Sequence, residues 1–449
     1  MKVAKFGGTS LADAGQIRKV IEITKADPER RIIVVSAPGK RTKDDIKVTD
    51  LLIACAKAML ARGEAEKELG AVVGRFAEIQ RELELPESLT REIEADLRRR
   101  LARDRSHAAA FTDCLKAAGE DNCAKVVAAA FVRGGTDARY VNPREAGMLL
   151  SAEHGNAQVL PEAYPLLARL RDGSGIQVFP GFFGYTKQGE VVTFPRGGSD
   201  ITGAILAAAV KADVYENFTD VDSVYAVDPR LVPDAKPITL MTYREMRELA
   251  YAGFGVFHDE AIVPAVHAKV PICVKNTNRP SAPGTMIVPK REFAEHGAVG
   301  ISSSDGFTMI YVDKYLMNRE VGFGRRLLQI LEDEGVSYEH APSGIDNTSV
   351  IVDQGVLPPE KEAHILARIR NELGPDNVEV EHNLALIMVV GEGMQYTVGL
   401  AAKATHALAS AGVNIEMMNQ GSSEISMMFG VKGVDREKAV KALYGAFFG

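Results

Sequence analysis

The chain has 449 residues, of which 46% are hydrophobic and 25% charged, a balance typical of a soluble globular protein with two or three domains. The net charge of −7 and the pI of about 5.8 argue against nucleic acid or an anionic membrane as the main partner. No apolar run approaches the roughly 18 residues of a membrane helix. Because the first strand pattern carries Lys2 and Lys5, we expect no signal peptide. The four cysteines form no C-x-x-C pair, so we expect buried, reduced thiols in a cytoplasmic protein.

The N-terminal part of the chain alternates strand and helix patterns. Short apolar strands are expected at 3–6 and 32–36, separated by an amphipathic helix over 11–26 with Ser10 as its N-cap. The charged segment from 44 to 105 is expected to be helical. Further strands are expected at 176–179, 191–193, 214–218 and 272–274, with a helix over 202–211. This alternation predicts an α/β sheet covered on both faces.

The C-terminal part contains an internal repeat. TMIYV at 308–312 corresponds to ALIMV at 385–389, and NTSVI at 347–351 corresponds to EISMM at 424–428. Both pairs have an offset of about 77 residues, which indicates a duplicated domain rather than a solenoid. Each copy reads strand, helix, strand, strand, helix, the order of a ferredoxin-like βαββαβ module. Because residues 280–300 are rich in proline and glycine, we expect a boundary there. The expected domains are 1–290, 305–380 and 381–449, with the last one completed by a strand near 298–304.

The segment KVAKFGGTS at 2–10 places a lysine and two glycines at the end of the first strand. Glycines at this position let the backbone approach an anion, and a following helix directs N–H groups at it. The alternative interpretation is a tight turn with an exposed lysine. The P-loop pattern G-x-x-x-x-G-K-[ST] does not occur in the sequence.

The segment FPRGGSDITGAIL at 194–206 repeats this arrangement of a basic residue, two glycines and a helix start. Asp200 alone would be read as a helix cap. Two helix N-termini facing one gap, however, would hold a highly charged anion from both sides. Phosphoryl transfer depends on such positioning and charge neutralisation more than on covalent chemistry.

The segment NFTDVDSVYAVDPR at 217–230 follows a strand and is rich in aspartate. It is either a polar surface loop or a nucleotide-binding loop. In the second case Tyr225 would pack against the base, Arg230 would reach phosphate and an aspartate would help to hold Mg²⁺.

Taken together, these three segments resemble the aspartate kinases of the amino acid kinase family. VVSAPG at 34–39, VTDLL at 48–52 and the C-terminal repeat, which is similar to paired ACT modules, extend the resemblance over nearly the whole chain. The resemblance implies a three-layer αβα sandwich with a mainly parallel sheet, followed by two ACT modules. It also implies ATP- and Mg²⁺-dependent phosphorylation of the aspartate side-chain carboxylate, the first step toward lysine, threonine and methionine. The expected form is monofunctional, without a homoserine dehydrogenase domain.

The resemblance also assigns roles to individual residues. It implies catalytic roles for Lys5, Asp200 and Arg196, and aspartate binding by Ser36, Thr49, Glu120, Arg196, Gly198 and Ser199. ATP would be bound by Lys5, Gly7, Gly8, Ser10, Thr219, Asp220, Tyr225 and Arg230, and by Gly255 and Val256 in a loop that departs from the family pattern. Without the resemblance, Glu120 would be interpreted as a surface glutamate, and His258 is expected to be structural.

The ACT modules imply feedback inhibition by an amino acid of the pathway. The expected effector site comprises Met317, Gly322, Phe323, Gly324, Ser337, Tyr338, Glu339, Ser343 and Gly344. Lysine is the expected inhibitor, with threonine or a concerted pair as alternatives. The modules imply a homodimer, and whether dimers pair into tetramers stays open. Two other functions are considered: a kinase of the same fold acting on acetylglutamate, glutamate or UMP, and a catalytically inactive amino-acid sensor.

Overall fold

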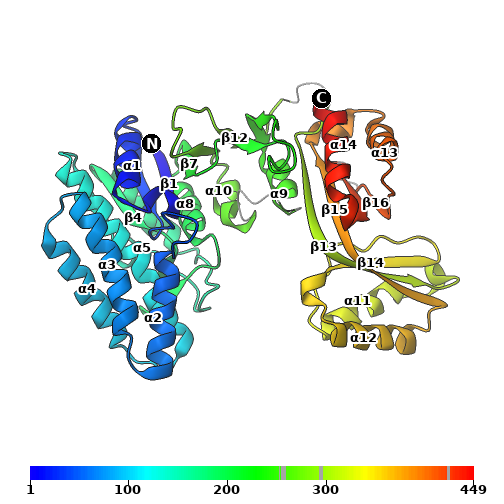
Figure 1. The fold of residues 1–449 in the computed structure, drawn as a ribbon, viewed down its shortest axis with the longest axis horizontal. Coiled ribbons are helices and arrows are strands. Elements are labelled where there is room, and N and C mark those ends of the chain that lie inside the picture. The colour runs from blue at the N-terminus through cyan, green and yellow to red at the C-terminus, as the bar shows by residue number, and fades with distance from the viewer. Residues whose placement is uncertain (252, 254–258, 293–296, 422–424) are drawn as a thin grey trace. The chain divides into compact units, whose positions relative to one another are not determined.

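The computed structural model of the protein describes residues 1–251, 253, 259–292, 297–421 and 425–449. The chain forms two compact units (Figure 1). The N-terminal unit comprises Met1–Val224, Pro237–Tyr243 and Val256–Arg291. The C-terminal unit comprises Tyr225–Lys236, Arg244–Gly255 and Glu292–Gly449.

The N-terminal unit is built on a mainly parallel sheet with the strand order β10-β12-β11-β7-β1-β2-β4-β3. The antiparallel pair is β11 with β12. Central strands such as β2 are runs of apolar residues because both faces of a parallel sheet are buried. The strands are β1 (Lys2–Phe6), β2 (Arg30–Val35), β3 (Ala138–Tyr140), β4 (Ile176–Pro180), β7 (Val214–Thr219), β10 (Leu240–Thr242), β11 (Ile272–Asn276) and β12 (Thr285–Val288).

Helices cover both faces of this sheet, as the α/β alternation predicts (Figure 1). One face carries α1 (Ala14–Lys25), α2 (Val48–Arg62), α3 (Glu66–Glu82), α4 (Glu87–Leu101) and α5 (Ala108–Arg133), whose apolar sides enclose Ala4 and Phe6 of β1. The other face carries α8 (Gly198–Ala209), with α7 (Ala163–Leu167) and α10 (Val263–His267) packed on it. Because side chains alternate along a strand, Lys5 points toward α8, away from Phe6. The three-layer αβα architecture is therefore confirmed.

Short elements complete the N-terminal unit. They are α6 (Pro143–Ala146), the antiparallel pair β5 (Phe183–Tyr185) and β6 (Val191–Thr193), and strand β9 (Pro237–Ile238), which pairs with β8 (Val224–Tyr225). Of β8, Val224 is counted with this unit and Tyr225 with the C-terminal unit. The strand expected at 191–193 is therefore present as β6, but it pairs with β5 outside the main sheet. In the part of the chain that the structure describes, no helix combines the length and apolarity needed to cross a membrane.

Two helix starts differ from the expectation. Gly8–Leu11 forms a 3₁₀ turn, and α1 begins only at Ala14 because Asp13, rather than Ser10, caps it by accepting the N–H of Gln16. The second helix, α8, begins at Gly198 instead of residue 202. The charged segment after residue 44 forms α2, α3 and α4 as expected, and all four cysteines are free and buried.

The C-terminal unit is built on an antiparallel sheet with the strand order β14-β13-β15-β17-β16. Two long strands run through both copies of the repeat: residues 300–305 of β13 pair with 385–390 of β15, and residues 309–313 pair with 377–381. Its strands are β13 (Gly300–Asp313), β14 (Asn347–Asp353), β15 (Asn377–Val390), β16 (Met417–Asn419) and β17 (Ser426–Lys432). Its helices are α9 (Tyr243–Tyr251), α11 (Phe323–Asp333), α12 (Pro359–Arg368), α13 (Leu400–Ser410) and α14 (Arg436–Phe448).

The two copies of the repeat are not equally regular. The second copy has both expected strands between its helices, β16 and β17. In the first copy only β14 is a full strand, and the other expected strand is reduced to isolated bridges at His340 and Ser343. Each copy nevertheless has its own apolar core, one around α11 and α12 and the other around α13 and α14.

Candidate active site

Lys5 is the centre of a buried polar cluster where β1 and β7 lie side by side. The two parallel strands place Lys5 directly opposite Asn217. The Lys5 Nζ atom lies 2.7 Å from Oδ1 of Asp200, in the first turn of α8, and 3.5 Å from Oδ1 of Asn217. Asn217 in turn donates its Nδ2 hydrogen to the same Asp200 oxygen over 2.5 Å. Lys5 is only 7% exposed, so its position is fixed by partners on two elements. The alternative of an exposed lysine in a tight turn is wrong.

The glycine turn after β1 is packed against a second loop. The N–H of Gly39 donates to the carbonyl of Gly8 over 2.8 Å, and a Cβ on Gly39 would lie 2.5 Å from Gly8. Gly39 therefore excludes a larger residue, and a Cβ on Gly7 would lie 3.6 Å from the Lys5 ammonium. The backbone of Gly7 and the ammonium group of Lys5 thus lie side by side, an arrangement that favours binding of an anion. Ser10 is buried, and its hydroxyl bonds that of Thr277 over 2.6 Å.

The second glycine pair needs glycine for two different reasons. Gly197 has a φ of 83°, in the left-handed region that glycine favours. Gly198 packs against the ring of Phe182, which a Cβ would approach to 2.6 Å. Together they turn the chain so that α8 begins with Gly198 and Ser199, directly beside the Lys5 cluster. Arg196 precedes this turn and is exposed, without an ion pair among the described residues.

Glu120 lies in the middle of α5 and is 5% exposed, so its interpretation as a surface residue is wrong. The backbone N–H of Ala37 hydrogen bonds to its carboxyl group, which places it at the loop that also carries Gly39. Its Oε2 atom has no partner among the described residues. Burial raises the pKa of Glu120 to about 8, because desolvation penalises the charged form. Such a carboxyl group is mostly protonated at neutral pH unless a cation binds beside it.

Two smaller side chains complete this side of the site. Ser36 follows β2 and donates its N–H to the carbonyl of Phe6, so it lies beside the end of β1. Thr49 lies in the first turn of α2 and is half-buried. The same 36–49 segment therefore borders the glycine turn, Glu120 and the start of α2.

Comparison with known proteins agrees with this geometry. A profile of the amino acid kinase family matches residues 1–276, and an ACT domain profile matches 387–447. The chain is 56% identical to Aspartokinase 3 of Bacillus subtilis (strain 168), over 100% of this chain and 99% of that protein. The chain belongs to the amino acid kinase family. More narrowly, it is an aspartate kinase, and the recognition from the sequence motifs is confirmed.

Solved aspartate kinases share the architecture of both units. The aspartate kinase of Clostridium acetobutylicum is 38% identical, with a TM-score of 0.87 and coverage of 99% of each chain. E. coli aspartokinase III is 27% identical and is known in two complexes, each covering 100% of both chains. The complex with aspartate and ADP (R-state) has a TM-score of 0.78, and that with lysine and aspartate (T-state) has a TM-score of 0.77.

The expected nucleotide-binding residues of this aspartate kinase fall in different parts of the structure. Thr219 ends β7, and its hydroxyl lies 3.2 Å from Oδ1 of the exposed Asp220. Tyr225 belongs to the C-terminal unit, where it packs on an apolar core. Arg230, in the same unit, is exposed and pairs with Asp228 over 2.7 Å. These two residues are therefore not assigned to the Lys5 cluster. Gly255, Val256 and His258 lie outside the described residues.

Part of the expected effector site of the aspartate kinase comes together in the C-terminal unit. Met317 lies in the 3₁₀ turn after β13, and Asn318 beside it donates its N–H to the carbonyl of Ile345. This contact brings the turn next to Ser343 and Gly344. Gly322, with a φ of 81°, caps α11, which begins with the buried Phe323 and with Gly324.

The other expected effector residues lie further along the edge of the same sheet. Ser337 and Tyr338 are exposed, and the N–H of Glu339 donates to the carbonyl of Ile351 on β14. The carboxylate of Glu339 accepts a hydrogen bond from the hydroxyl of Tyr251 at the end of α9. An effector ammonium group at Glu339 would therefore compete with Tyr251.

Two residues that position the site were missed from the sequence. Asn217 bridges Lys5 and Asp200, and its only signal is a polar residue inside an apolar strand. Arg75 of α3 is 5% exposed and donates to the carbonyl of Gly39 over 2.6 Å and to Asp45 over 2.8 Å. It fixes the loop against which the glycine turn packs. Nothing in the pattern of a charged amphipathic helix distinguishes Arg75 from its solvated neighbours.

Proposed function

We propose that this aspartate kinase transfers the γ-phosphoryl group of ATP to the side-chain carboxylate of L-aspartate, producing 4-phospho-L-aspartate and ADP. The observation that carries the proposal is the buried Lys5 ammonium, held by Asp200 beside the backbone of Gly7. The solved complex of E. coli aspartokinase III with aspartate and ADP supports the same pair of ligands. This step begins the synthesis of lysine, threonine and methionine.

The reaction needs charge neutralisation rather than a general base. A side-chain carboxylate is already ionised at pH 7, so its oxygen attacks the γ-phosphorus while the bond to the bridging oxygen of ADP breaks. Lys5 stabilises the charge that spreads over the equatorial oxygens. The N–H groups at the start of α8, around Gly198 and Ser199, and that of Gly8 are proposed to bind phosphate beside it, whereas the N–H of Gly7 donates to the carbonyl of Phe218.

The substrate is oriented by groups of opposite charge on either side of it. Glu120 takes the α-ammonium group, which supplies the cation that its buried carboxyl group lacks. Arg196 holds the α-carboxylate, for which a planar guanidinium is well suited. Ser36 and Thr49 add hydroxyl contacts. Thr219, Asp220, Tyr225, Arg230, Gly255 and Val256 are proposed to bind ATP, with Ser10 supporting the phosphate turn.

Mg²⁺ is proposed to bind together with ATP. No cluster of three or more metal-ligating side chains occurs among the described residues. Mg²⁺ does not need such a cluster, because it usually binds through one or two carboxylates together with the substrate phosphates. Both contacts of Asp200 use Oδ1, so its other oxygen is available in the described structure. When bound, the ion neutralises phosphate charge.

Regulation is proposed to reside in two ACT modules, 305–380 and 381–449, which follow a catalytic domain at 1–290. The match of the ACT profile and the lysine complex of E. coli aspartokinase III support lysine as the inhibitor. The effector site comprises the residues around Met317, Gly322 and Glu339 named above. We further propose a homodimer formed through these modules. The four free cysteines support a cytoplasmic location, where thiols stay reduced.

A hydroxamate assay tests the catalytic proposal. Hydroxylamine traps an acyl phosphate, so the full chain with ATP and Mg²⁺ should yield a hydroxamate with L-aspartate. We expect no comparable product with L-glutamate or acetylglutamate, and no ATP consumption with UMP. ATP consumption without a trapped product, or a preference for another acceptor, would contradict the assignment.

A further inference from the structure

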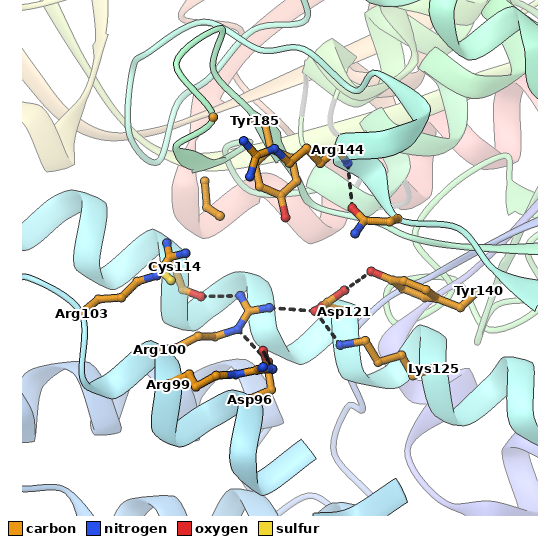
Figure 2. Close-up of a pocket in the computed structure, with 13 residues that line it drawn as sticks. Asp96, Arg99, Arg100, Arg103, Cys114, Asp121, Lys125, Tyr140, Arg144 and Tyr185 are labelled. Carbon is orange, nitrogen blue, oxygen red and sulfur yellow. Dashed lines mark hydrogen bonds and ion pairs between the residues drawn. The ribbon is translucent and has the colours of Figure 1, made fainter. Parts of the chain in front are cut away.

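The N-terminal unit contains a second polar pocket, separate from the Lys5 cluster. It has a volume of about 420 Å³ and opens between α4, α5 and the β5–β6 hairpin (Figure 2). Most of its wall is charged or aromatic. Its lining consists of Asp96, Arg99, Arg100, Arg103, Cys114, Asp121, Lys125, Tyr140, Asn142, Arg144, Tyr185, Gly189 and Val191.

The floor of the pocket is a rigid network around Asp121. One oxygen of Asp121 accepts from the hydroxyl of Tyr140, and the other accepts from Arg100 over 2.7 Å and from Lys125 over 3.0 Å (Figure 2). Arg100 also pairs with Asp96 over 2.7 Å. Asp121 is 6% exposed, and the side chain of Arg100 is 11% exposed. The carboxylates are therefore saturated by groups of the protein itself, and the floor keeps its geometry without a ligand.

The rim of the pocket carries positive charge that the protein does not neutralise. Five cationic side chains line the pocket against two carboxylates, Asp96 and Asp121. Arg103 and Arg144 have no carboxylate partner among the described residues, and Arg144 lies over the ring of Tyr185 instead, 5.8 Å from its centroid. Figure 2 shows Arg144 and Tyr185 across the cavity from Arg100. Such clustering of like charge in a cavity favours a bound anion.

The position of the pocket separates it from the proposed aspartate site while linking both to one helix. Glu120 and Asp121 are neighbours on α5, but Glu120 contacts the Ala37 loop, whereas Asp121 contacts Arg100 and Tyr140. A pocket of this volume accommodates a small metabolite rather than a chain segment. A ligand with a single negative charge could pair with only one or two of the cationic side chains that line the pocket.

We propose that this pocket binds a small anion with at least two carboxylate or phosphate groups, which Arg103 and Arg144 bind from the rim while Arg100 and Lys125 face it from the floor. The inference concerns a ligand other than ATP and aspartate, and it does not depend on the proposed roles of Lys5 or Glu120.

Titration calorimetry on the full chain tests the proposal, with citrate and inorganic pyrophosphate as probes in Mg²⁺-free buffer of constant ionic strength. We expect one saturable site per chain for at least one probe, with a Kd below about 1 mM, and none for acetate. Tighter binding of citrate would indicate a polycarboxylate as the natural ligand, and tighter binding of pyrophosphate would indicate a phosphate compound. The double variant R103A/R144A should weaken binding at least tenfold, because each arginine supplies a charge-assisted hydrogen bond.

Two control variants make the test specific. R81A/R91A removes the same charge from exposed positions on α3 and α4 and should bind like the wild type. K5M removes the phosphate contact of the active site and should also retain binding. Absence of saturable binding for both probes would refute the proposal. So would binding that K5M abolishes and R103A/R144A leaves intact, since the anion would then occupy the active site.

Discussion

The strongest prediction concerns the pH dependence of aspartate binding through Glu120. Its carboxyl group is buried and has a pKa of about 8, so in the unliganded enzyme it is mostly protonated at pH 7. The proposed contact with the substrate ammonium requires the ionised form. Aspartate binding should therefore release a proton from Glu120, and the affinity should rise with pH until Glu120 is ionised in the free enzyme.

The size of the effect follows from the pKa. If only the ionised form binds, the apparent KM is multiplied by one plus the ratio of protonated to ionised Glu120. For a pKa of about 8 this factor is about 100 at pH 6, about 11 at pH 7 and about 2 at pH 8. The KM for aspartate should thus fall about fifty-fold between pH 6 and pH 8, with most of the change below pH 7.5. The carboxylates of the substrate are ionised throughout this range and contribute no slope.

Steady-state kinetics of the wild type and of Glu120→Gln at saturating ATP measure this slope. The glutamine keeps the shape of the side chain but cannot ionise, so its KM should be roughly ten- to hundredfold higher at pH 8 and nearly independent of pH. Glu87→Gln, at an exposed position at the start of α4, is the matched control and should follow the wild type. A flat wild-type profile, or the same slope in Glu120→Gln, would refute the reasoning.

Four further outcomes are expected. Because the folded pKa of Glu120 lies above its ordinary value of 4.5, the folded state loses stability relative to Glu120→Gln as pH rises from 5.5 to 8, by on the order of 3 kcal/mol, which thermal melts of both proteins would show. Lys5→Ala should lower kcat about 10²- to 10³-fold with little change in KM, whereas Lys2→Ala, on the same strand, should retain activity; equal kinetics of both variants would remove the assigned role. Glu339→Ala should weaken inhibition by lysine about tenfold and leave basal turnover intact, and unchanged inhibition would exclude this pocket. Arg75→Met should destabilise the enzyme by roughly 2 kcal/mol, because the Gly39 carbonyl loses its donor and Asp45 keeps only Arg41 as a partner; an unchanged Tm would contradict the role of Arg75 in holding the Gly39 loop.

Much of the fold could be predicted because buried parallel strands and duplicated modules leave patterns that depend on local sequence alone. The apolar run of β2 and the repeat across β13 and β15 are examples. The errors lie where tertiary contacts decide. Asp13 caps α1 in place of Ser10, whose hydroxyl instead hydrogen bonds to that of Thr277, directly after β11. The segment before β14 would be the outermost strand of the sheet, and it pairs with β14 only through isolated bridges. Whether such an edge segment forms a full strand depends on contacts in the folded sheet.

The glycine motifs could be located from the sequence, but the physical reasons for them could not. Gly39 looks like an ordinary loop glycine until its approach to Gly8 is known. Asn217 acts only because the register of β1 and β7 places it opposite Lys5. Composition and periodicity describe local sequence, so they cannot predict which residues become neighbours when the segments are more than 200 residues apart. The family resemblance supplied Glu120, which residue-level reasoning placed on the surface.

The structure explains why Glu120 follows a glycine. Gly119 lies against the Ala37 loop, and a Cβ there would lie 2.8 Å from that of Ala37, so α5 can approach the loop only with glycine at this position. This approach brings the Glu120 carboxyl group to the N–H of Ala37 and excludes the water that would otherwise solvate it. The same loop, through Gly39, supports the turn that carries Gly8. One close contact therefore determines both the raised pKa at the proposed ammonium site and the position of the proposed phosphate turn.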